Sequence, residues 1–196
     1  MTRWFEKVRR TSRIEEIGEM LDALPHGERV KEVRSMCGAT QALLWEMAER
    51  TEVTLDDLVP PDVPSLTPVI HYGKNSLPLL SSFEKRFCRP AQPRDPDVQY
   101  GYNEGVTRPL VGPGYFMVRA TPGNTKGSVV IDYYMTPSEK PVSWPEISTK
   151  DSGIPAVVYG FMHDYLRKVS SHVTIGRAFK HHKVTSNYFL LCREDV

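Results

Sequence analysis

The sequence predicts an α+β fold: an N-terminal helical hairpin, a proline-rich middle with one short helix, and a C-terminal antiparallel sheet (β-β-α-β-β) with a packed helix. Three observations favour this class. Apolar residues recur at helical spacing up to about residue 50, ten of the sixteen prolines lie between residues 60 and 113, and apolar and polar residues alternate from residue 115 onward. Strands that are separate in sequence from helices are typical of α+β proteins. We therefore expect a helical hairpin over 1–51, a linker over 52–68 and an α+β domain over 69–196.

The N-terminal region has the spacing of two amphipathic helices. Ser12 and Glu15 form a capping box at the start of the first helix, which we expect over residues 12–24. A second helical stretch covers residues 28–50 and can divide at Gly38. One hairpin cannot bury both apolar stripes, so this unit packs on the rest of the chain or on a second copy, and a homodimer through these helices is a predicted interaction. The first stripe consists of Ile14, Ile17, Leu21 and Leu24.

Residues 71–90 combine one His, four Lys or Arg and one Cys with two Pro and one Gly. Residues 71–75 are interpreted as a loop, because Gly and Asn favour turns. Ser76 is a suitable N-cap for a short helix over 78–89, which Pro90 ends. The apolar stripe of this predicted helix consists of Leu79, Leu80, Phe83 and Phe87.

The C-terminal region changes to a period of two. Residues 115–121 and 128–135 alternate on either side of a Gly-rich turn, which predicts an antiparallel hairpin. A helix is expected over 155–169 because its apolar residues return every three to four positions. Two further strands are expected over 172–180 and 185–193.

Composition excludes several classes of protein. The chain has 196 residues, of which 40% are hydrophobic and 25% charged, which is ordinary for a soluble globular protein. No apolar run approaches the roughly 18 residues of a membrane span, and the N-terminus lacks the pattern of a secretion signal. The three cysteines are odd in number and widely spaced, which indicates reduced thiols in a cytoplasmic protein.

The charge distribution leaves one alternative open. The net charge of +1 is too small to indicate a polyanionic partner, but residues 165–183 hold five Lys or Arg and no acid. Nucleic-acid binding through this basic run is therefore an alternative. It is disfavoured as a partner interaction because no recognition motif accompanies the run.

The predicted loop over 71–75 is the first candidate binding site. Lys74 and Asn75 lie beside His71 at the start of a predicted helix, where anions are favoured. Arg86 borders the apolar side of that helix and can contribute a second cation. The predicted ligand-binding residues are Lys74, Asn75, Arg86, Arg108 and Tyr134.

Asp132 is the most unusual acid, because it lies in the middle of a predicted strand, where an unpaired buried carboxylate is costly. Either its face is solvated or it points into a polar pocket with Tyr134, Arg119 or a histidine. A carboxylate beside a histidine can act in general acid–base chemistry, which makes His71 and Asp132 the candidate catalytic residues. Nothing in the sequence itself places these two side by side.

Several kinds of site are excluded by spacing. None of the six histidines occurs in HExxH or a similar ligand pair, so no metal is predicted. The chain has no GxSxG, no GxGxxG placed between strand and helix, and no phosphate-binding loop, so no cofactor is predicted either. Whether the protein is an enzyme is left open.

The aromatic residues are explained by packing in the core and sheet, with a small-molecule pocket as the alternative. Six of them fall within 35 residues, and tyrosines that share one cavity suit a small polar or aromatic ligand. The predicted function is binding of a small, anionic or aromatic ligand in a tyrosine-lined pocket; an oligomerisation or interaction module without catalysis is the main alternative. The six clustered aromatic residues are Tyr100, Tyr102, Tyr115, Phe116, Tyr133 and Tyr134.

Overall fold

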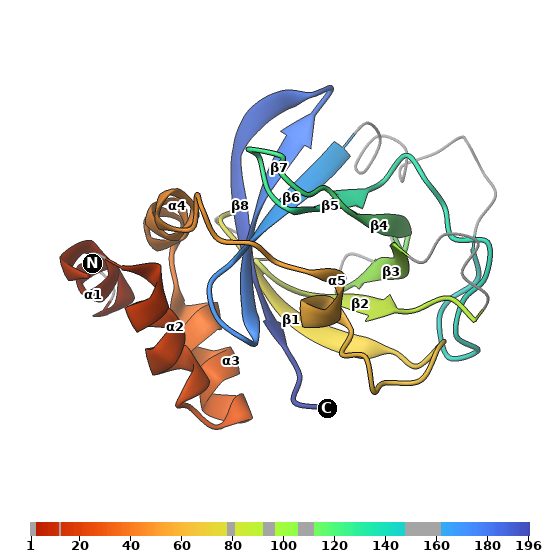
Figure 1. Ribbon diagram of the computed structural model, residues 1–196, viewed down its shortest axis with the longest axis horizontal. Coiled ribbons are helices and arrows are strands. Elements are labelled where there is room, and N and C mark those ends of the chain that lie inside the picture. The colour runs from red at the N-terminus through yellow and green to blue at the C-terminus, as the bar shows by residue number, and fades with distance from the viewer. Residues whose placement is uncertain (1–2, 12, 78–80, 92–96, 106–111, 148–161) are drawn as a thin grey trace.

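The computed structural model describes residues 3–11, 13–77, 81–91, 97–105, 112–147 and 162–196. Within these residues, eight strands form a closed antiparallel barrel in which each strand pairs with its neighbours in sequence and β1 pairs with β8 (Figure 1). The predicted α+β fold is therefore wrong, because the sheet closes on itself and takes up most of the described residues after residue 68. The strands are β1 (Val69–Asn75), β2 (Ser82–Cys88), β3 (Val98–Glu104), β4 (Phe116–Ala120), β5 (Val129–Asp132), β6 (Met162–Lys168), β7 (Val173–Lys180) and β8 (Lys183–Arg193). The helices are α1 (Arg3–Arg10), α2 (Ile14–Asp22), α3 (His26–Ser35), α4 (Gly38–Met47) and α5 (Leu55–Leu58).

The short helix predicted over 78–89 is wrong where the structure describes it, because this segment contains β2; residues 78–80 lie outside the described residues. Phe83 and Phe87 are four positions apart, a spacing that fits a helix as well as a strand. Lys85 lies between them and points to the same inner side of the barrel. A polar residue at an inner position thus concealed the period of two.

The packed helix predicted over 155–169 is also wrong, because its described part is β6; residues 155–161 lie outside the described residues. Asp164 points into the barrel, while Arg167 on the outer face is covered by the N-terminal helices. Both faces of the strand are therefore mixed in polarity, and Arg167 is buried on the outer face, which weakens the alternation of a half-exposed strand. The predicted loop over 71–75 is likewise part of a strand, β1.

The predicted strands after residue 115 and the early helices correspond to elements of the structure. β4, β5, β7 and β8 lie within or largely overlap the predicted strands, although β5 ends at Asp132. α2, α3 and α4 lie in the predicted helical region, and α4 begins at Gly38, where a division was expected. The local sequence patterns therefore predicted these elements correctly, although the predicted fold class was wrong.

On the inner side of the barrel, large rings are placed against glycines on neighbouring strands. A Cβ atom at Gly101 would lie 2.3 Å from the Phe116 ring, so only glycine leaves room for this ring. Alternation of small and large inner residues is usual in barrels of this size. The three such pairs are Gly73 with Phe83, Gly101 with Phe116, and Gly176 with Phe189.

The segment around α5 closes one end of the barrel. Thr54 and Asp57 form a capping box that starts this helix. Leu58 is fully buried in one apolar cluster with Val69 and Phe87 of the barrel wall. Apolar contacts between this short helix and the barrel wall therefore close this end of the barrel.

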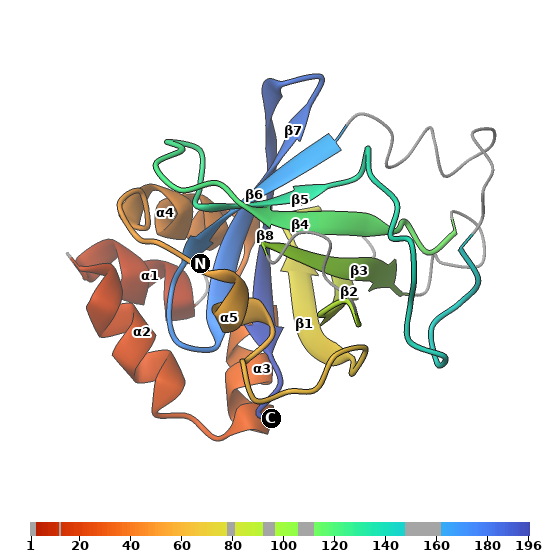
Figure 2. The same ribbon diagram turned by 45° about the vertical axis from the view of Figure 1, so that its right-hand side comes forward.

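The helices α1–α4 gather on one side of the barrel (Figures 1 and 2). α3 and α4 contact β8, and further contacts reach β1 and β7. Val33 and Leu44 of these helices share one buried cluster with Ile175 and Leu190 of the barrel's outer wall. None of the described helices is both long and apolar enough to cross a membrane.

Candidate functional site

The centre of the barrel contains a buried ion pair. Lys85 of β2 and Asp164 of β6 are each only 3% exposed, and Lys85 Nζ lies 3.4 Å from Asp164 Oδ2. β2 and β6 are four strands apart in either direction around the barrel, so the pair spans the lumen from opposite walls. Two charges in an otherwise apolar interior are costly unless they are paired and hydrogen-bonded.

Two further polar side chains complete this cluster. Lys85 Nζ donates a 2.8 Å hydrogen bond to Asn103 Oδ1 of β3 and a second one to the Tyr133 hydroxyl. The Tyr133 hydroxyl also lies 3.3 Å from Asp164 Oδ2. Because Tyr133 follows β5 directly, four separate parts of the barrel wall contribute to one network, which we call the lumen cluster: Lys85, Asn103, Tyr133 and Asp164.

Aromatic rings surround the amine of Lys85. Its Nζ lies 5.1 Å from the ring centres of Phe116 and Tyr133. The corresponding distances are 5.2 Å for Phe189 and 5.6 Å for Phe83. The faces of aromatic rings attract cations, so these four rings stabilise a positive charge at this point of the lumen.

Burial shifts the pKa of each partner of the ion pair in the direction that favours its uncharged form. It lowers the pKa of the Lys85 ammonium, while the attraction of Asp164 opposes this shift. It raises the pKa of the Asp164 carboxyl, against the effects of Lys85 and Tyr133. Since the charged and neutral forms of the pair differ only by transfer of one proton from Lys85 to Asp164, this proton can move within the cluster without a change in the net charge.

Several polar atoms on the inner wall lack a partner. Within the described strands β1, β3, β6 and β7, four buried atoms of inward-facing residues have no hydrogen-bond partner. Such atoms are rare in proteins and mark places where a ligand or ordered water belongs. They are Asp164 Oδ1, His71 Nδ1, Gln99 Oε1 and Thr174 Oγ1.

The two ends of the lumen differ. At the α5 end, Leu58 and Phe87 are fully buried. At the other end, Phe83 and Tyr133, whose rings lie near Lys85, are only partly buried. A small molecule would therefore enter from the end that carries Phe83 and Tyr133.

His71, a predicted catalytic residue, lies inside the barrel and holds α5 in place. Its Nε2 donates a 2.9 Å hydrogen bond to the Leu58 carbonyl oxygen, and its ring packs edge-on against Phe87. Burial lowers the pKa of His71 to about 3, so the imidazole is neutral. In the register of β1 with β2 it lies directly beside Lys85, which places it on the wall of the lumen below the cluster.

Asp132, the other predicted catalytic residue, lies on the outer wall. Its Oδ2 accepts a 2.5 Å hydrogen bond from Arg119, its Oδ1 accepts a 2.9 Å bond from the Tyr134 backbone, and His163 Nε2 lies 3.5 Å away. The Tyr134 ring stacks on His163. The structure thus brings Asp132 together with three of the expected kinds of partner, but the barrel wall separates it from His71.

The remaining predicted ligand-binding residues do not converge. Lys74 donates to Ser81 Oγ, and Asn75 accepts a hydrogen bond from the Leu77 backbone at the rim. Arg86 points outward and pairs with Glu84 at 2.9 Å. Arg108 lies outside the described residues.

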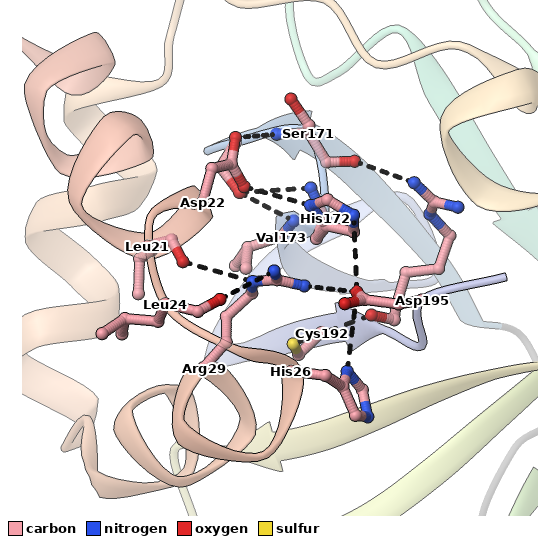
Figure 3. A network of polar contacts seen from close by, with 12 residues as sticks. Leu21, Asp22, Leu24, His26, Arg29, Ser171, His172, Val173, Cys192 and Asp195 are labelled. Carbon is pink, nitrogen blue, oxygen red and sulfur yellow. Dashed lines mark hydrogen bonds and ion pairs between the residues drawn. The ribbon is translucent and has the colours of Figure 1, made fainter.

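A second polar network joins the helices to the C-terminal tail (Figure 3). Arg29 is buried and donates to the Leu21 and Leu24 carbonyl oxygens and, at 2.6 Å, to Asp195. His172 lies between Asp22 and Asp195, at 3.2 Å and 3.4 Å. Because these contacts join the α2–α3 region to the residue before β7 and to the tail after β8, the network fixes the helices to the barrel. Among the described residues no three His, Cys, Asp or Glu side chains gather as a metal site would require.

A surface hollow of about 580 Å³ lies between α2 and the turn that joins β6 to β7. It is lined by Glu15, Glu19, Asp22 and Glu52, with Lys168 as its one basic residue. None of the unpartnered buried atoms of the described residues belongs to its lining. The lumen cluster is therefore the better candidate site.

Three of the four lumen-cluster residues, Lys85, Asn103 and Asp164, were not predicted, and Tyr133 was noted only as an aromatic. Lys85 and Asp164 each stand between residues that are otherwise suited to an inner wall, such as Phe83 and Phe87. A charge at the inner position of an alternating segment is the signal that could have found them.

No family model, no curated protein and no solved structure matches this chain. Its function therefore has to be inferred from the geometry of the barrel.

Proposed function

We propose that the barrel binds a small molecule in its lumen, with the ligand's polar head at the lumen cluster and its apolar body among the aromatic rings. The observation that carries this proposal is Asp164 Oδ1, a buried acceptor without a protein partner among the described residues. This atom belongs to a buried ion pair, and apolar side chains of the same volume would give a barrel of similar or higher stability. A ligand that donates a hydrogen bond to this atom removes the cost of its burial.

The chemistry of the cluster favours a neutral head group. Asp164 already offsets the charge of Lys85, so a second anion would meet a carboxylate without a free cation beside it. A hydroxyl or amide N–H suits Asp164 Oδ1 better, and an aromatic body suits Phe83 and Tyr133 at the open end. The predicted ligand class thereby narrows from anionic or aromatic to aromatic with a hydrogen-bond donor.

Titration with benzyl alcohol, benzamide and benzoate, followed by NMR of aromatic side chains, tests this proposal. We expect the alcohol and the amide to shift signals of Phe83 and Tyr133, and benzoate to do so less. If none of the three compounds perturbs these rings, the lumen is not a binding site for this class.

Matched double variants separate binding from folding. Lys85→Met/Asp164→Leu replaces the ion pair with apolar groups of similar size and should abolish the shifts caused by benzyl alcohol while keeping the fold. Arg119→Met/Asp132→Leu makes the same change on the outer wall and should bind as the natural protein does. Equal binding by both double variants would contradict the proposal.

The two alternatives have less support. The apolar stripes of α1–α4 pack against the barrel, so they leave less surface for a homodimer, which stays a prediction. In the basic run, three cations already donate hydrogen bonds within the protein: Arg167 to the Trp45 carbonyl oxygen, Lys168 to Asp57, and Arg177 to the Thr185 carbonyl oxygen. The cytoplasmic location also stays a prediction.

A further inference from the structure

We propose that Lys85 attaches a carbonyl ligand covalently: its amine condenses with an aldehyde or ketone bound in the lumen to form an imine. This inference rests on the proposed binding in the lumen and adds a second class of ligand for the same site: aromatic aldehydes and ketones, which react with Lys85 instead of donating a hydrogen bond to Asp164. Among the described lysines, Lys85 is the only buried one, and its amine lies inside the barrel, where a bound carbonyl group would be held beside it.

The surroundings of Lys85 can stabilise both the reactant and the product of this reaction. The starting ammonium and the product iminium each carry one positive charge at the same nitrogen. Asp164 at 3.4 Å and the faces of Phe116 and Tyr133, both 5.1 Å away, therefore stabilise the product as well as the reactant. Burial also lowers the pKa of Lys85, which increases the fraction of the nucleophilic neutral amine.

The reaction balances without a co-reactant. The ammonium gives one proton to Asp164, and the neutral amine then adds to the carbonyl carbon to form the C–N bond. The carbonyl oxygen takes that proton and becomes the hydroxyl of a carbinolamine. Loss of this hydroxyl with a second proton from the nitrogen breaks the C–O bond and releases water, which leaves an iminium with one N–H. No oxidant, reductant or metal takes part in these steps.

The lumen cluster contains groups that can accept and return the protons that move during imine formation. Asp164 Oδ2 faces the amine, while Oδ1 can accept a hydrogen bond from the new carbinolamine hydroxyl. The Tyr133 hydroxyl contacts Lys85 Nζ and lies 3.3 Å from Asp164 Oδ2, so it can relay a proton between nitrogen and carboxylate. Asn103, which accepts from Lys85 at 2.8 Å, orients the amine.

The test is reductive trapping of the natural protein with benzaldehyde and cyanoborohydride at neutral pH. Reduction of the iminium adds the mass of benzaldehyde less one oxygen atom, and peptide mapping locates the adduct. We expect Lys85 to be labelled on the order of tenfold faster than exposed Lys31 and Lys183, because a bound carbonyl is held beside the amine. Benzyl alcohol, which cannot condense, should slow the labelling of Lys85 alone.

Three controls complete the design. Lys85→Met should lose the fast labelling, whereas Lys74→Met, which alters a lysine of the neighbouring strand, should keep it. If Lys85→Met does not fold, the comparison of Lys85 with Lys31 within the natural protein still decides. Unfolded protein in denaturant should show equal labelling of these lysines.

The outcomes separate the two proposals. Benzyl alcohol that perturbs the lumen rings, together with labelling of Lys85 no faster than Lys31, overturns the imine and leaves ligand binding intact. Absence of both effects overturns both proposals. Fast labelling of Lys85 that benzyl alcohol suppresses supports both.

Discussion

The ion pair Lys85–Asp164 is the residue-scale feature with the largest consequence for stability. Each charge is buried at a cost that only the other charge and the surrounding hydrogen bonds offset. We expect Asp164→Leu alone to lower the free energy of unfolding by about 3–5 kcal/mol, because it leaves Lys85 uncompensated. The double variant Lys85→Met/Asp164→Leu should be about as stable as the natural protein. Urea unfolding of the two variants measures the difference; equal losses in both would show that the pair contributes packing rather than charge.

His71 makes stability depend on pH at the residue scale. Burial lowers its pKa from 6.5 to about 3, so the unfolded chain binds a proton that the folded chain does not. This contribution is fully present above pH 6.5 and is lost as the pH falls toward 3, at about 1.4 kcal/mol per pH unit. His71→Gln can still donate to the Leu58 carbonyl oxygen but does not titrate, so its stability should fall less steeply below about pH 6. Val142→Gln, at a fully exposed position that carries no titratable group, is the control and should leave the slope unchanged.

At the scale of elements, the barrel depends on close approach between strands and rings. A Cβ at Gly101 would lie 2.3 Å from the Phe116 ring and 2.6 Å from the Arg86 carbonyl oxygen, which cannot move without distorting β2. Gly101→Ala should therefore destabilise the protein by about 1–3 kcal/mol. Gly27→Ala, in a helix where no atom lies within 4 Å of the new methyl group, should be neutral or stabilising by up to about 1 kcal/mol. Thermal unfolding of both variants tests this contrast, and similar melting temperatures would contradict it.

The elements also explain which strands the sequence could indicate. β5 and β8 carry apolar inner residues such as Ile131 and Leu191, so their period of two is visible. β2 and β6 carry Lys85 and Asp164 at inner positions, and β3 carries Asn103 there. The strands that form the lumen cluster are therefore the ones whose patterns were hardest to interpret, because a local hydrophobic rule fails where a buried polar group is placed.

At the scale of the whole molecule, the helices are a cover for the barrel's outer wall. Ile175 and Leu190 are fully buried beneath α3 and α4, and Arg167 donates to the Trp45 carbonyl oxygen of α4. Deletion of residues 1–50 should therefore expose an apolar face and give aggregation rather than a folded smaller protein. Sedimentation of the truncated chain tests this expectation. A soluble, folded monomer would instead support separate folding of the two parts and the predicted role of the helices in dimerisation.

The sequence by itself determined the local elements whose faces are clearly sorted by polarity. The helical stripe of Ile14, Ile17 and Leu21, the division at Gly38 and the strand pattern around Ile131 follow from side-chain period and backbone preference, which act over a few residues. The tertiary structure decided everything that depends on closure. Only when β1 pairs with β8 does an inside exist, and only then do Lys85 and Asp164, almost eighty positions apart, meet across it. The free energy of burying these two charges depends on the closed barrel and on the contact between them. Neither can be recognised from a short stretch of the sequence.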